Sequence, residues 1–111
     1  MEDTADTESD ALMVVFVTFP SEEKARQIGT LLVKRQLIAC INILPGVSSI
    51  YTWDGKICED RECLGILKTG AGKFGELKAA VNELHPYDVP EIVAVEADKV
   101  DEKYLDWVLG K

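Results

Sequence analysis

The dipeptide Asp54-Gly55 lies between two long runs of strand-forming residues, and it constrains the fold more than any other feature. Asp-Gly is a strong signal for a two-residue hairpin turn, because both turn positions require a positive φ angle. Residues 37–53 precede the dipeptide and residues 56–69 follow it. The sequence therefore predicts one long antiparallel hairpin.

A second dipeptide, Pro45-Gly46, interrupts the first of these two runs. Proline has no backbone N–H to give to a strand ladder, and glycine relaxes the backbone. Strand-like residues continue on both sides, so the interruption is interpreted as a β-bulge within one long strand and not as the end of that strand.

The rest of the chain alternates between strand-like and helix-like patterns. LMVVFVTF predicts a buried strand, and Ser21 is a good N-cap for the helical pattern that follows it. The predicted elements are strands at 12–19 and 92–97, helices at 21–36, 73–84 and 101–110, and the hairpin between them. Their order is β-α-β-β-α-β plus a terminal helix, which is the plan of an α+β, ferredoxin-like sandwich.

The charge distribution separates a short acidic tail from the domain. The chain has a net charge of -8, and residues 1–10 contribute five acids and no base. We expect residues 1–10 to be a disordered tail and residues 11–111 to form one domain. The remaining 15 acids against 12 bases argue against nucleic-acid binding, which depends on Lys and Arg. No run is long and apolar enough for a bilayer and no basic leader opens the chain, so we expect no membrane partner and a cytoplasmic protein.

In several predicted strands the side chains that point to either face of the sheet are apolar, including residues 14–17 and residues 92–95. In a ferredoxin-like sandwich two helices cover one face of the sheet, and the other face is normally polar. The terminal helix is too short to cover a whole second face. The pattern therefore predicts that another subunit covers it.

The three cysteines do not form a disulfide framework or a zinc-finger pattern. In the predicted hairpin Tyr51 faces Cys58, and Cys63 lies five residues further on, about 16 Å away and on the opposite face. Cys40 lies further along, near the Thr69 end. We expect no disulfide and no shared metal among these thiols within one protomer, and we expect Cys40 to be buried.

The segment HPYDVPE, residues 85–91, contains the only histidine. Two prolines make it a rigid connector between a helix and a strand. A catalytic histidine needs a nucleophile or an orienting acid at a defined distance. Because no nucleophile elbow, phosphate loop or HExxH motif accompanies His85, the sequence does not point to an enzyme.

Five segments together resemble the CutA divalent-cation tolerance family, over residues 13–109. They are VTFPSEEKA, LIACINILPGVSSIYTWDGKICEDRE, ILKT, HPYDVPEIVAV and YLDWV. The resemblance implies a ferredoxin-like protomer assembled as a compact homotrimer, similar to PII signalling proteins. It also implies a role in copper and divalent-metal tolerance without an accepted enzymatic reaction.

The resemblance also implies candidate metal ligands for copper or another divalent cation. Copper-binding members that resemble this chain have a cysteine where this chain has Val17, and a histidine where it has Leu84. His85 and Cys40 remain as the candidate metal ligands. One imidazole and one thiol are fewer than the usual three or four protein ligands, so the predicted site is weak unless a second subunit or a carboxylate completes it.

A second candidate site is a cleft between subunits. Lys68, Tyr87 and Glu59 are the residues expected to bind a small anionic ligand there. The leading hypothesis is a non-enzymatic homotrimer involved in divalent-metal tolerance. The alternatives are a PII-like sensor of a small ligand and a trimeric scaffold for another protein.

Overall fold

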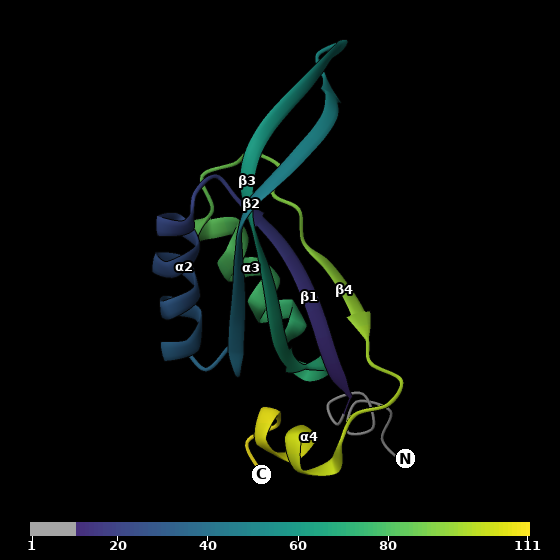
Figure 1. Cartoon of the computed structure of the whole chain (residues 1–111). Helices are drawn as coiled ribbons and strands as arrows, with labels where there is room; N and C mark the ends of the chain where they lie inside the picture. Colours follow the sequence, from purple (N-terminus) through teal and green to yellow (C-terminus); the bar gives the residue numbers. More distant parts are fainter. Residues whose placement is uncertain (1–10) are drawn as a thin grey trace.

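A computed structural model describes residues 11–111 (Figure 1). The acidic tail predicted for residues 1–10 lies outside the described residues. The elements are β1 (Leu12–Phe19), α2 (Glu22–Lys34), β2 (Cys40–Trp53), β3 (Lys56–Gly70), a 3₁₀ turn (Ala71–Lys73), α3 (Phe74–Leu84), β4 (Val93–Glu96) and α4 (Glu102–Val108).

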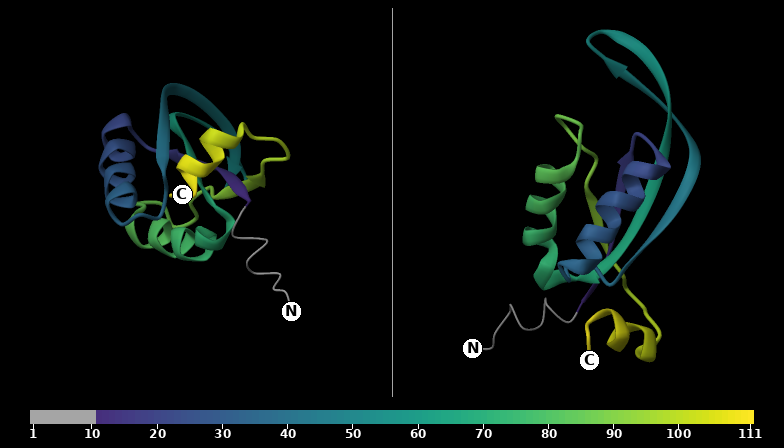
Figure 2. Two further views of the ribbon diagram at one scale, coloured as in Figure 1. Left: turned by 90° about the horizontal axis from the view of Figure 1, so that it is seen from below. Right: turned by 90° about the vertical axis from the view of Figure 1, so that its left-hand side faces the viewer.

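The four strands form one antiparallel sheet in the order β2-β3-β1-β4. Helices α2 and α3 lie side by side on the same face of this sheet (Figure 2). Ser21 caps α2 as predicted, and its side chain accepts a hydrogen bond from the backbone N–H of Lys24 at 3.1 Å. The predicted α+β, ferredoxin-like βαββαβ fold with a C-terminal helix is confirmed.

The β2-β3 hairpin has the predicted turn and register. Asp54 and Gly55 have φ angles of 54° and 76°, as a two-residue turn with two left-handed positions requires. Tyr51 lies opposite Cys58, and Ile50 lies opposite Glu59.

The predicted bulge is also present. The β2-β3 ladder shifts register between Leu44 and Val47, and Gly46 has a φ angle of 78°. Beyond the bulge the two strands leave the body of the molecule and form a projecting arm (Figure 1). The arm accounts for the elongated shape, which measures 50 × 26 × 26 Å.

The core lies between the sheet and the two helices. Alternate residues of β1 point into it, and Val15, Val17 and Phe19 are fully buried. Full burial of such a side chain stabilises the folded state by about 1.5–3 kcal/mol. Gly65 of β3 pairs with Val17 on the core-facing side of the sheet. A Cβ atom at Gly65 would be 2.8 Å from Cε2 of Phe19. The core therefore leaves no room for a side chain at Gly65.

The second face of the sheet carries the apolar residues of the other parity. Its residues are Val14, Phe16, Leu44, Leu64, Ile66, Val93 and Val95. The short helix α4 lies at one end of the sheet, where the Tyr104 hydroxyl is 3.7 Å from the Cys40 sulfur (Figure 1). Val93 and Val95 are 50% and 52% exposed. In a single protomer α4 thus leaves much of this apolar face open.

The three cysteines are free. Cys63 faces the core and is buried, whereas Cys58 is half-buried, in agreement with their predicted placement on opposite faces. Cys40 differs from its expected burial, because it lies on the second face and is half-buried beside α4.

Within residues 11–111, none of the helices has the length and apolar character needed to cross a membrane.

Candidate functional site

The loop of residues 85–91 connects α3 to β4 and passes the base of the arm (Figure 1). His85 ends α3, and its backbone N–H donates to the carbonyl of Val81 at 2.8 Å. Its φ and ψ angles are -77° and 139°. This extended geometry follows from Pro86, because a residue before proline avoids the helical region.

Both ring nitrogens of His85 have backbone partners. Nε2 lies 2.7 Å from the carbonyl oxygen of Thr18, and Nδ1 accepts a hydrogen bond from the N–H of Tyr87 at 3.1 Å. A carbonyl can only accept and an amide can only donate. One form alone satisfies both bonds, namely the neutral ring with its proton on Nε2.

The imidazole of His85 is also packed into the protein. It stacks on the Phe19 ring at a centroid distance of 5.3 Å, and the residue is 6% exposed. Burial lowers the pKa of His85 below its ordinary value of 6.5, against opposing contributions from the Thr18 carbonyl and the Glu62 carboxylate. The ring is therefore a neutral structural clasp that joins the loop to β1.

The neutral His85 makes stability depend on pH. Its pKa is lower in the folded chain than in the unfolded chain, so the unfolded chain binds more protons as the pH falls through 6.5. The His85 contribution is complete above pH 6.5 and decreases below it. We expect the free energy of unfolding, measured by urea denaturation, to fall as the pH is lowered from about 6.5 to 5.5, and to fall less steeply in His85→Asn. Equal slopes in the two proteins would contradict this assignment.

The two predicted metal ligands do not meet within one protomer. Cys40 lies opposite Lys68, which pairs with Val14, whereas the His85 ring is bonded to Thr18. Val14 and Thr18 are four residues apart on β1, or about 13 Å. Within residues 11–111 no group of three or more His, Cys, Asp or Glu side chains is placed to hold a metal ion. A metal site formed by His85 or Cys40 stays a prediction that requires ligands from elsewhere.

Two residues of the predicted ligand cleft are also far apart within a protomer. Lys68 donates to the side chain of Asn42, whereas the Tyr87 hydroxyl donates to Glu62 at 2.6 Å. Glu62 and Lys68 are six residues apart on β3, or about 20 Å. Glu59 is exposed on the arm. The assignment of these residues to an intersubunit cleft stays a prediction.

The structure shows a different concave surface, here named the arm groove, between the arm and the loop. It has a volume of about 610 Å³. It is lined by residues 49–51 and Trp53 of β2, Asp60 and Glu62 of β3, Thr18 of β1, and residues 87–89 and 91 of the loop. Strand alternation puts Asp60 and Glu62 on one face of β3, because they are two residues apart, but no sequence pattern brings the loop acids Asp88 and Glu91 to them.

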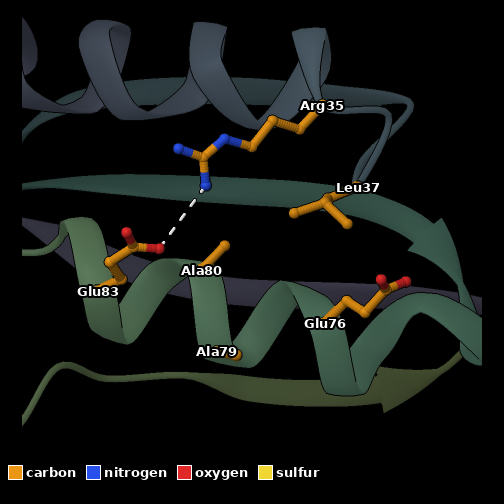
Figure 3. A pocket seen from close by; sticks show the side chains of 6 residues that line it. All are labelled: Arg35, Leu37, Glu76, Ala79, Ala80 and Glu83. Atoms are coloured by element: carbon orange, nitrogen blue, oxygen red, sulfur yellow. Dashed lines mark ion pairs between the residues drawn. The ribbon is translucent and has the colours of Figure 1, made fainter.

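A second, smaller groove lies between the helices (Figure 3). It has a volume of about 390 Å³, and its polar side chains are Arg35, Glu76 and Glu83. Nη1 of Arg35 lies 3.8 Å from Oε1 of Glu83. Both side chains are exposed, so this ion pair contributes little to stability.

Known proteins are similar to this chain in sequence and in fold. The family model described as "CutA1 divalent ion tolerance protein" matches residues 13–111. The divalent-cation tolerance protein CutA of Thermus thermophilus is 50% identical over 95 residues, which cover 86% of this chain and 92% of that protein. Its counterpart from Pyrococcus horikoshii is 44% identical, with 88% of this chain and 95% of that protein covered.

Solved structures agree with the sequence matches. A structure of the Thermus thermophilus protein has a TM-score of 0.85 at 49% identity, and it covers 87% of this chain and 94% of its own. A crystal structure of CutA1 from Oryza sativa has a TM-score of 0.88 at 37% identity, with 90% and 92% covered. With this fold and a family match over nearly all described residues, the chain belongs to the CutA1 divalent ion tolerance family.

Proposed function

We propose that the chain is a non-enzymatic homotrimer that acts in divalent-cation tolerance in the cytoplasm, with copper as the principal ion. The observation that supports assembly most strongly is the apolar second face of the sheet. The relatives named as divalent-cation tolerance proteins support the role in tolerance.

The second face and the sheet edges support contact between copies. Val93 and Val95 are half-exposed, and Leu44 is 42% exposed. Strands β2 and β4 form the two edges of the sheet, so each presents backbone groups that another copy can pair with. Contact between two different surfaces of the same chain closes into a ring when the rotation fits. The number three follows from the family resemblance.

The proposal includes no catalysis, and the hydrogen bonds of His85, the only histidine, support this part of it. Both nitrogens of His85 are engaged by backbone groups, so the ring is not free to take a proton from a substrate. The same two bonds mean that coordination of a cation by His85 would require one ring nitrogen to be released from its backbone partner.

Assembly is tested by light scattering coupled to size-exclusion chromatography. We expect a mass three times that of the 12.3 kDa chain. The double variant Val93→Lys/Val95→Lys places two charges on the second face and is expected to give monomers. The matched control is Leu31→Lys/Val33→Lys, which changes two partly exposed apolar residues of α2 away from the sheet. A monomeric wild type, or equal dissociation of both variants, would contradict the proposal.

Copper binding is tested on the same proteins. Within one protomer His85 and Cys40 lie at different ends of β1, so a copper site in this proposal needs ligands from more than one copy. Isothermal titration with Cu(II) is expected to show weak binding to the trimer and a large loss in Val93→Lys/Val95→Lys. Equal binding by a folded monomeric variant would show that the ligands belong to a single protomer.

A further inference from the structure

We propose that the groove between α2 and α3 binds a linear zwitterion, an aliphatic chain with a carboxylate at one end and an ammonium group at the other. The groove has a volume of about 390 Å³, a size that suits a small ligand. It lies on the helical side of the sheet, opposite to the apolar second face (Figure 2). A trimer that covers the second face therefore leaves this groove open, and the inference goes beyond divalent-cation tolerance.

The groove has opposite charges at its two ends. Arg35 follows the last turn of α2, and its side chain reaches across toward Glu83 of α3 (Figure 3). Glu76 and Glu83 are seven residues apart on α3, which is about 10 Å along the helix axis. The cationic end at Arg35 and the anionic end at Glu76 are thus separated by a stretch of the groove that a compact ion does not span.

The guanidinium of Arg35 keeps most of its donors available. Its Nη1 lies 3.8 Å from Oε1 of Glu83, which is longer than a hydrogen bond. Within residues 11–111 its side chain has no other partner. A guanidinium offers a planar fork of N–H donors that binds a carboxylate through two parallel hydrogen bonds. Arg35 is therefore suited to hold the carboxylate of a ligand.

Glu76 lacks a counter-charge in the part of the chain that the structure describes. Lys73 is three residues earlier, a spacing that allows a pair on a helix. Its Nζ instead donates to the backbone carbonyl of Gln36 at 2.7 Å. Among residues 11–111 Glu76 takes part in no ion pair. An ammonium group of a ligand would supply the missing positive charge.

The middle of the groove is apolar and held in place. Ala79 and Ala80 lie between the two glutamates on α3, and Leu37 faces them from the opposite wall (Figure 3). The buried hydroxyl of Thr69 donates to the carbonyl of Leu37 at 2.7 Å, and the Lys73 bond fixes the preceding residue. Methylene groups of a ligand fit between these apolar side chains. A wall fixed in advance also reduces the entropy lost on binding.

The test is a titration of the full chain with ε-aminocaproate at constant ionic strength, followed by amide NMR. We expect the signals of Leu37, Ala79 and Ala80 to shift and to reach saturation. Hexanoate and hexylamine each lack one of the two charges, and glycine is too short to reach both ends. Each is expected to bind at least about tenfold more weakly, the effect of losing one charge-assisted contact. Equal binding of any of the three, or no saturable shift at millimolar ε-aminocaproate, would overturn the proposal.

Matched variants separate the groove from general charge attraction. Arg35→Gln and Glu76→Gln are each expected to weaken binding at least about fivefold. The controls Arg26→Gln and Glu23→Gln change the same residue types on α2 outside the groove, and they are expected to change binding less than about twofold. Glu83→Gln removes a carboxylate that competes for Arg35 and is expected to bind at least as tightly as the wild type. Equal losses in groove and control variants, or a loss in Glu83→Gln without one in Glu76→Gln, would overturn the extended arrangement.

Discussion

Gly65→Val is expected to destabilise the folded chain by roughly 3 kcal/mol, the upper part of the range for overpacking a core. A Cβ at this position would lie 2.8 Å from Cε2 of Phe19, 3.1 Å from Cδ1 of Ile41 and 3.3 Å from Cδ1 of Leu67. Phe19 and Leu67 are fully buried, so neither can move into solvent. Urea denaturation at a fixed protein concentration measures the change.

The control for Gly65→Val is Gly75→Ala in α3. A Cβ at Gly75 meets no atom within 4 Å, and alanine favours a helix over glycine by up to about 1 kcal/mol. Gly75→Ala is thus expected to be neutral or slightly stabilising. Phe19→Leu shortens the ring nearest to Gly65, so the double variant with Gly65→Val should be less destabilised than the sum of the two single variants. Additive losses would show that the Phe19 contact is not the cause.

His85→Ala is expected to destabilise the folded chain by roughly 2–4 kcal/mol. The substitution leaves the carbonyl of Thr18 and the N–H of Tyr87 without their side-chain partner, and it removes the ring stacked on Phe19. The loss combines unsatisfied polar groups with a cavity. It is measured by urea denaturation near pH 7.5, where the wild-type ring is neutral.

Two further variants divide this loss between the two ring nitrogens. In His85→Asn the side-chain oxygen can accept from the N–H of Tyr87, in place of Nδ1. In His85→Gln the longer amide can donate toward Thr18, in place of Nε2–H. Each is expected to recover part of the stability lost in His85→Ala. A His85→Ala protein as stable as the wild type would mean that the clasp does not form in solution.

The hairpin could be predicted from sequence because its determinants are local. Asp54-Gly55 specifies a two-residue turn, and the turn length then fixes every pair up to the bulge. The bulge could also be predicted from the sequence, because the missing backbone N–H is a property of Pro45 itself. Pattern and turn chemistry therefore predict the long hairpin, the order of the elements along the chain and the two-sided apolar sheet.

The candidate site could be predicted only in part, because its contacts join distant segments. The ring of His85 bonds to Thr18, 67 positions away in sequence. Nothing in HPYDVPE specifies that partner, and the family resemblance made His85 a candidate metal ligand. The arm groove depends on how the bulged arm leaves the body, which brings Asp60 near Asp88. Strand alternation assigns Asp60 to one face of β3 but does not specify which residues lie opposite that face.

The pairing of β1 has a consequence for synthesis of the chain on the ribosome. Strand β1 is a central strand, and one of its neighbours is β4, with Met13 opposite Glu96. Its apolar edge therefore stays unpaired until nearly the whole chain has been translated. Contacts of such long sequence separation form slowly, and an open apolar edge in a nascent chain invites aggregation. Chains released before β4 is made are expected to depend on chaperones, even though the hairpin within them can already fold.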